Sequence, residues 1–196
     1  MTLNELEKDF EQLSEKIKKF FKDRDNDSFL KESEKFIVSN PDNKSIHVYR
    51  GIILEEKEQY EEAVKSFEIV TENCPDFYHI FKMKGYCYLQ LKCYALARDA
   101  YKESLRYNDK DAEAWCYTAL CFYFEDKKAV AIGLLDHAMG LVENKSLVSL
   151  LKGMLYEKED MDEDALISYV ESQIFSRDEE EKQVAGERAF KMFNKD

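Results

Sequence analysis

Apolar residues recur along nearly the whole chain at intervals of three and four, which is the spacing of amphipathic helices. In residues 44–77, Ile46 and Ile53 fall on one side of a first helix, and Ala63 and Phe67 fall on one side of a second. The chain of 196 residues holds only 6 glycines and 2 prolines, too few breakers for a β-fold with many tight turns. The pattern therefore predicts an all-α protein built from pairs of helices.

The helix pairs repeat with a period of 34 residues. Both prolines, Pro41 and Pro75, are one period apart. Further series keep the same spacing: Ala63, Ala97, Ala131 and Ala165; Gly51, Gly85, Ala119 and Gly153; Leu54, Tyr88, Phe122 and Tyr156; Phe67, Tyr101, Leu135 and Tyr169. Agreement in several series at once indicates a stack of like units.

This period resembles the tetratricopeptide repeat family, whose pattern is W-x2-L-G-x2-Y, then A-x3-F, then P. The nearest first half is Trp115-x2-Thr118-Ala119-x2-Phe122, and the second half recurs as Ala63-x3-Phe67, Ala97-x3-Tyr101, Ala131-x3-Leu135 and Ala165-x3-Tyr169. The resemblance implies a right-handed solenoid of antiparallel helix hairpins, in which stacked neighbours bury a continuous core.

The period also sets the expected organisation of the chain. An N-terminal helix pair, a degenerate repeat, takes up 1–43; four clear repeats follow at 44–77, 78–111, 112–145 and 146–179; a C-terminal capping helix takes up 180–196. We expect these parts to form one continuous domain.

Small residues at two positions of each repeat let its helices approach closely. Gly or Ala stands in the first helix and Ala in the second, while large aromatic residues fill the space between helix pairs. Polar residues stand where helix N-caps are expected: Asp42 and Asn43, Asp76, and Asp109 and Asp111.

The two ends of the chain carry their own patterns. Apolar residues at steps of four and three form a heptad stripe at the start: Leu6, Phe10, Leu13, Ile17 and Phe20. We expect this stripe to pack on the next helix as the beginning of the solenoid; a homodimer through the N-terminal helix is the alternative. In the last segment Ala185, Ala189 and Phe193 share one face with Phe190 beside it, and charges cover the rest, as a solenoid cap requires.

The formal net charge is -12, with 41 acidic and 29 basic residues. This field repels phosphate backbones and anionic lipid surfaces, so we expect no nucleic-acid binding. The chain shows neither a transmembrane run nor a secretory signal, so we expect no membrane insertion and a cytoplasmic location. The five cysteines, an odd number without a C-x-x-C pair, are interpreted as small, reduced core residues.

Two acidic stretches come close to the calcium-binding EF-hand loop, D-x-[DN]-x-[DN]-G-x5-E. They are Asp23-x-Asp25-x-Asp27-Ser28-x5-Glu34 and Asp160-x-Asp162-x-Asp164-Ala165-x5-Glu171. Both lack the glycine of the sharp turn, and Ala165 is also the packing alanine of its repeat. Each is better interpreted as an acidic turn followed by carboxylates near a helix N-terminus. A calcium-modulated protein remains a minor alternative.

No other arrangement of reactive residues suggests catalysis or a cofactor. The cysteine spacings do not fit zinc, and the histidines, His47, His79 and His137, are scattered over three repeats. His47 is expected in the core and His79 on the groove. We expect no metal, no cofactor and no enzymatic activity, because no converging catalytic constellation is visible.

The family resemblance places ligands on the concave face, which the first helix of each hairpin lines. Carried over by repeat position, this groove comprises Val48, Ile52, His79, Lys82, Tyr86, Leu89, Cys116, Leu120, Tyr123, Phe124, Leu150 and Met154, with Glu55 beside them. Only Lys82 matches the basic positions with which related co-chaperones clamp a partner's carboxylates, so such a clamp is not expected.

The surface so predicted is apolar and aromatic, which suits an amphipathic helix or an extended apolar segment. We therefore expect a non-catalytic protein-protein interaction module, an adaptor or assembly scaffold that binds a protein or peptide ligand. The alternative is a chaperone that shields an apolar client segment, because small bacterial type III secretion chaperones for translocator proteins look similar in repeat and composition. Some of these residues are core instead if curvature buries them, and the chain's own terminal helix is another candidate to cover them.

Overall fold

The computed structural model describes residues 11, 13–41, 43–74 and 77–193. Within these residues the chain forms eleven α-helices and no strand, so the all-α prediction is confirmed. The helices are α2 (Glu15–Lys22), α3 (Asn26–Ser39), α4 (Lys44–Glu56), α5 (Tyr60–Asn73), α6 (Tyr78–Gln90), α7 (Tyr94–Tyr107), α8 (Ala112–Phe124), α9 (Lys128–Leu141), α10 (Ser146–Lys158), α11 (Asp162–Phe175) and α12 (Glu179–Phe193).

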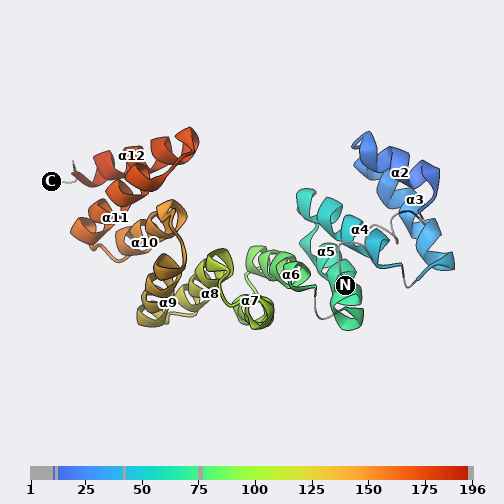
Figure 1. Ribbon diagram of the computed structural model, residues 1–196, viewed down its shortest axis with the longest axis horizontal. Coiled ribbons are helices and arrows are strands. Elements are labelled where there is room, and N and C mark those ends of the chain that lie inside the picture. Colours follow the sequence, from blue (N-terminus) through green and yellow to red (C-terminus); the bar gives the residue numbers. More distant parts are fainter. Residues whose placement is uncertain (1–10, 12, 42, 75–76, 194–196) are drawn as a thin grey trace. The chain divides into compact units, whose positions relative to one another are not determined.

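The helices pair into hairpins that follow the sequence period (Figure 1). The first helices, α4, α6, α8 and α10, begin at Lys44, Tyr78, Ala112 and Ser146. Within each pair the second helix starts after a short turn. Contacts also link successive pairs: α5 packs on α6, α9 on α10, and α11 on the last helix, α12. This successive packing is that of a helical repeat protein.

The chain divides into two compact units, Met1–Asn108 and Asp109–Asp196. The first contains α2 to α7 and the second contains α8 to α12. Each unit has its own buried apolar clusters, with Phe67 and Val70 at the centre of one and Leu135 and Val148 in the other. That all repeats act as one continuous domain stays a prediction.

The repeat glycines lie directly under aromatic rings, which refines the expected role of both residues. A Cβ on Gly51 would collide with the ring of Phe67, and one on Gly85 would meet the ring of Tyr101 at 3.0 Å. The ring therefore packs on the bare backbone of the partner helix inside the hairpin, and does not only fill space between hairpins.

The turn inside every hairpin contains a non-glycine residue in the left-handed conformation. These residues are Arg24, Glu58, Lys92, Asp126 and Asp160, with φ between 55° and 61°. In the second clear hairpin the turn is closed by bonds from Lys92 N to the Leu89 carbonyl and from Cys93 N to the Tyr88 carbonyl. Such bonds satisfy carbonyls at the helix end and reverse the chain within three residues.

Two of the expected N-caps are present. The Asn43 side chain accepts a bond from Ile46 N at 3.0 Å, and that of Asp111 accepts one from Ala114 N at 3.1 Å. Asp42 and Asp76 lie outside the described residues, and Asp109 precedes the cap position of α8.

The described part of the N-terminal stripe packs inside the first unit. Leu13 and Ile17 are buried against Phe29, Ile46 and Ile53. Leu6 and Phe10 lie outside the described residues, and a homodimer through this helix stays a prediction.

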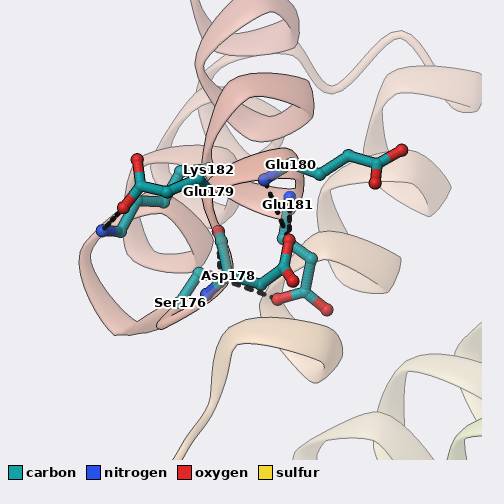
Figure 2. Close-up of polar contacts among 6 residues, drawn as sticks. All are labelled: Ser176, Asp178, Glu179, Glu180, Glu181 and Lys182. Carbon is teal, nitrogen blue, oxygen red and sulfur yellow. Dashed lines mark hydrogen bonds and ion pairs between the residues drawn. The ribbon is translucent and has the colours of Figure 1, made fainter.

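At the other end α12 packs on α11, with Ala185 and Ala189 buried and Phe190 exposed. Figure 2 shows how the helix begins: Asp178 Oδ1 accepts bonds from the backbone N of Glu180 and Glu181. The Glu181 carboxylate in turn accepts from the Ser176 and Ser146 hydroxyls, both at 2.8 Å. The bond from Ser146 connects the capping helix to α10.

Candidate functional site

The central groove position carries an apolar residue in each clear repeat. Ile52, Tyr86, Leu120 and Met154 follow one another at the 34-residue period, and all four side chains are partly buried. Each stands on the first helix of its hairpin, with one face packed and the other open to solvent. Because the chain forms two units, the faces of the first and the second unit are described separately.

In the first unit, α4 and α6 contribute to one surface. Ile52 packs against the cluster that contains Ile80 and Cys87 of α6. The ring of Tyr86 lies edge-on to that of Tyr60, with centroids 6.4 Å apart. The face therefore has an aliphatic floor beside two tyrosine rings.

Three further predicted residues extend this face along α6. Lys82 and Leu89 are partly buried, and His79 is exposed. The His79 ring stacks on Tyr78, with centroids 4.0 Å apart. An aromatic pair therefore stands at the N-terminal end of the helix.

Glu55 adds a carboxylate at the edge of this face. Its side chain is half-buried, and the buried oxygen Oε2 has no hydrogen-bond partner among the described residues. Burial raises the pKa of Glu55, and the neighbouring Glu56 charge raises it further. An unpaired carboxylate oxygen next to apolar groups attracts a cation, because it has lost the water that would otherwise solvate it.

In the second unit, α8 provides the exposed aromatic residues. Leu120 and Tyr123 pack at the edge of the cluster between α8 and α10, and Phe124 is exposed beside Tyr123. The Tyr123 hydroxyl donates to Glu159 Oε1 at 3.0 Å, and Lys128 Nζ contacts Glu159 Oε2 at 2.6 Å. Burial, with the bond to Glu159, raises the pKa of Tyr123, so its hydroxyl remains a neutral donor.

The last two predicted residues lie near the capping helix. Leu150 and Met154 pack at the edge of the cluster that includes Ala189 and Met192 of α12. An open pocket of about 320 Å³ is lined by Leu150, Asp178, Glu180, Glu181 and Val184. The chain's own last helix therefore covers part of this end of the face, and what stays open combines an apolar floor with carboxylates.

Val48 and Cys116 differ from the expectation of an accessible side chain. Both occupy the same repeat position, and their exposures are only 4% and 1%. Val48 belongs to the core cluster of the first unit and Cys116 to that of the second. Burial raises the pKa of Cys116 to about 12. Neither side chain offers surface to a partner, so both are left out of the proposed groove.

The cysteines and His47 are mostly in the core, as the sequence predicts, with one exception. All five thiols are free; Cys74, Cys87, Cys116 and Cys121 are buried and Cys93 is exposed. The His47 ring is buried, and its Nε2 lies 2.9 Å from the carbonyl oxygen of Pro41. The prediction of a core position was therefore wrong for Cys93, which directly precedes the second helix of its hairpin.

The two acidic stretches are largely helical. Helix α3 begins at Asn26 and α11 begins at Asp162, so Glu34 and Glu171 stand within helices. A twelve-residue loop that wraps around an ion is not formed in either place. Over the residues that the structure describes, no group of three or more His, Cys, Asp or Glu side chains converges as a metal site would require.

A recurring basic residue was missed in the sequence. Arg50, Lys84 and Lys152 stand one or more periods apart, and each side chain contacts the helix that precedes its own hairpin. Arg50 Nη1 donates to the Leu30 carbonyl at 2.9 Å, and Lys152 Nζ contacts Asp136 at 2.7 Å. These contacts connect successive hairpins, and the 34-residue spacing was the signal that could have revealed them.

Comparison with known proteins finds a known helical repeat in part of this chain and a similar fold in several solved structures. Residues 50–106 match the family model described as tetratricopeptide repeat. The crystal structure of MamA is similar, with a TM-score of 0.74 at 14% identity over 89% of this chain and 99% of that one. A thermophilic TPR protein from Thermus thermophilus gives a TM-score of 0.68 at 14% identity over 95% and 98% of the two chains.

A third similar structure is YrrB, described as a TPR protein with an unusual peptide-binding site. It has a TM-score of 0.57 at 17% identity, covering 83% of this chain and 89% of YrrB. No curated protein matches the sequence.

Residues 50–106 match the tetratricopeptide repeat model, and the described residues share the fold of solved tetratricopeptide repeat proteins, so the resemblance recognised from the 34-residue period is confirmed. Proteins built from this repeat are in general non-catalytic modules that hold other proteins or act as scaffolds. None of the helices described in the structure is both long and apolar enough to cross a membrane.

Proposed function

We propose that this protein is a non-catalytic adaptor or assembly scaffold that binds an amphipathic helix or an extended peptide on the apolar faces of its first helices. The observation that carries the proposal is the series Ile52, Tyr86, Leu120 and Met154, apolar in each clear repeat and partly open in all four. In a chain that is 36% charged, an apolar residue kept open at one repeat position favours contact with a partner.

The aromatic residues define the kind of contact. Tyr86 in the first unit and Tyr123 with Phe124 in the second offer large, rigid surfaces, which are typical anchors of protein interfaces. The likeness to YrrB, a TPR protein with a peptide-binding site, supports a peptide as ligand.

Charge favours a partner segment with basic residues. The net charge of -12 attracts cations over distance, and Glu55 offers a carboxylate with an unpaired oxygen beside the apolar floor. A Lys or Arg between apolar anchors would fit this edge of the first unit, since its charge would offset the cost of burying Glu55.

The test compares three forms of the purified protein as bait for native lysate, with captured proteins read by mass spectrometry. Wild type is set against Tyr86→Ala/Leu120→Ala and against a control, Leu96→Ala/Val130→Ala. The control residues are exposed, apolar and also one period apart, but stand on second helices. A partner kept by wild type and control but lost by the first variant supports the proposal; equal recovery by all three folded forms overturns it.

The chaperone alternative differs in what it does for the partner. Once a partner is named, co-expression in the same host separates the two functions. A chaperone keeps its client soluble, so the client precipitates with Tyr86→Ala/Leu120→Ala; an adaptor leaves the solubility of its partner unchanged.

A further inference from the structure

The outer side of α11 carries an exposed apolar stripe. Ile167, Val170 and Ile174 are 59%, 40% and 71% exposed and follow one another at steps of three and four, so they share one face of the helix. Branched apolar side chains this open are costly to leave in water, which makes the stripe a candidate contact surface.

The other hairpins show that the stripe is peculiar to the last one. The equivalent residues are Lys65, Glu68 and Glu72 in α5, Asp99, Lys102 and Arg106 in α7, and Gly133, Asp136 and Gly140 in α9. The first two sets are fully charged and the third has no large apolar side chain. The fold of the repeat therefore does not require apolar residues here, and a function outside the hairpin accounts for them better.

Phe190 of α12 extends the stripe. Three periods earlier in the chain, the equivalents of Phe190 and Val170 are Tyr88 and Glu68, and the Tyr88 hydroxyl contacts the Glu68 carboxylate at 2.9 Å. Carried over by repeat position, this packing of helix on helix is expected to bring Phe190 to the side of Val170. Its side chain is 72% exposed, so the patch consists of Ile167, Val170, Ile174 and Phe190.

The charges at the two ends of α11 suit a second copy of the same helix. Exposed Glu163 stands in the first turn, and exposed Arg177 follows the end of the helix by two residues. Neither forms an ion pair within the described residues. If two copies of α11 cross antiparallel with Val170 at the centre, Ile167 faces Ile174, and Glu163 of each copy lies beside the end of the partner helix, where Arg177 follows within two residues.

We propose that two copies of this chain associate through α11, antiparallel across a two-fold axis near Val170. Such an interface is self-complementary: each residue of the stripe meets a residue of the same stripe, and the opposed helix dipoles are also favourable. The surface of one helix and Phe190 is smaller than the roughly 800 Å² per partner of standard interfaces, so we expect a weak dimer that dissociates on dilution. No groove residue takes part, and the proposal is independent of the proposed function.

Sedimentation velocity over protein concentrations from a few to several hundred micromolar tests the proposal. Wild type is expected to shift from monomer to dimer with rising concentration, and Val170→Glu to weaken dimerisation at least tenfold, because it places two like charges at the axis. Val130→Glu, an exposed apolar position on α9, is the matched control and keeps the wild-type behaviour.

Charge exchange makes the test specific for the antiparallel arrangement. Glu163→Arg and Arg177→Glu each weaken the dimer by creating like-charged contacts, and the double variant restores it. A wild type that is monomeric at all concentrations overturns the proposal. So does a dimer that Val170→Glu leaves intact, which would point to the N-terminal helix, and so does a double variant no better than the two single ones.

Discussion

Gly153 lies directly beneath the ring of Tyr169. A Cβ at this glycine would come within 2.6 Å of two ring carbons, closer than real contacts allow. In the third clear hairpin the same two positions hold Ala119, which is larger than glycine, and Leu135, which is smaller than tyrosine. Where alanine replaces the glycine, leucine replaces the aromatic ring, so the two side chains together fit the space between the paired helices.

Gly153→Ala is expected to lower the free energy of unfolding of the second unit by about 1–3 kcal/mol, because the methyl group displaces the Tyr169 ring from its seat. Gly133→Ala is the control: nothing lies within 4 Å of a Cβ there, and alanine in a helix stabilises by about 0.5–1 kcal/mol relative to glycine. Urea unfolding followed by circular dichroism measures both.

The double variant Gly153→Ala/Tyr169→Leu copies the pair of the third clear hairpin. If the two residues act as one packing unit, the added cost of the alanine is smaller in the Tyr169→Leu background than in wild type. An alanine cost that is the same in both backgrounds would contradict direct packing of the ring on the glycine.

Lys92→Gly is expected to raise the free energy of unfolding of the first unit by up to about 1 kcal/mol, because Lys92 holds φ at 59° in the turn and glycine adopts this conformation without steric cost. Gln90→Gly, in the last turn of the preceding helix, should lower it instead. Equal destabilisation by both variants in urea would mean that the turn is not strained.

Glu157 of α10 bonds to side chains of α11 and α12, and these bonds make the stability of the second unit depend on pH. Its carboxylate accepts from the Tyr169 hydroxyl at 2.6 Å and from Arg188 at 2.8 Å. The bond from Tyr169 lowers the pKa of Glu157 below its ordinary 4.5, burial opposes this, and Arg188 lowers it further. Burial and the charge of Glu157 raise the pKa of Tyr169.

A lowered pKa of Glu157 in the folded protein contributes stability above pH 4.5, and this contribution is lost as the pH falls through the lowered value. Glu157→Gln is therefore expected to cost about 1–3 kcal/mol at pH 7 and progressively less as the pH falls below 4.5. Thermal unfolding at several pH values measures the gap; a gap that widens toward acid would contradict the role of the carboxylate.

Cys93 is expected to be the one thiol that reacts rapidly with Ellman's reagent in the native protein. The other four thiols are buried, and burial raises the pKa of Cys87 and Cys116 to about 12, so few thiolates form there. Cys93→Ser should abolish the fast phase, and all remaining thiols should react in denaturant. A fast phase that persists in Cys93→Ser would mean that a buried helix opens readily.

Much of the fold could be predicted because each hairpin repeats the same pattern of small and large apolar residues. The 34-residue spacing of Gly51, Ala63 and their equivalents located the hairpins, and the first helices of the structure begin at the starts of the predicted repeats. What the period could not show is the turn chemistry. Lys92 and its four equivalents adopt positive φ without glycine, and only the bonds of the formed hairpin impose that conformation.

The groove was harder to predict than the fold, because burial depends on neighbours that the period does not specify. Val48, Lys82 and Cys116 share one repeat position, yet Val48 and Cys116 are buried while Lys82 is only partly so. A short apolar side chain such as that of Val48 is buried between the helices, whereas a long charged side chain such as that of Lys82 keeps its charged end near water. Ile52 and Tyr86, four residues further along their helices, keep an open face in the structure.

Site-specific photo-crosslinking, with benzoyl-phenylalanine placed at position 86 or, separately, at position 96, tests most directly whether the first helices bind the partner. Tyr86 stands on the face proposed to bind a partner, and Leu96 is an exposed apolar residue on the second helix of the same hairpin. If the first helices bind the partner, one dominant partner is crosslinked from position 86 and not from position 96, and that product is lost when Ile52→Ala, on the same face of the first unit, is added. Crosslinking from position 96 alone would contradict binding on the first helices and place the binding surface on the second helices.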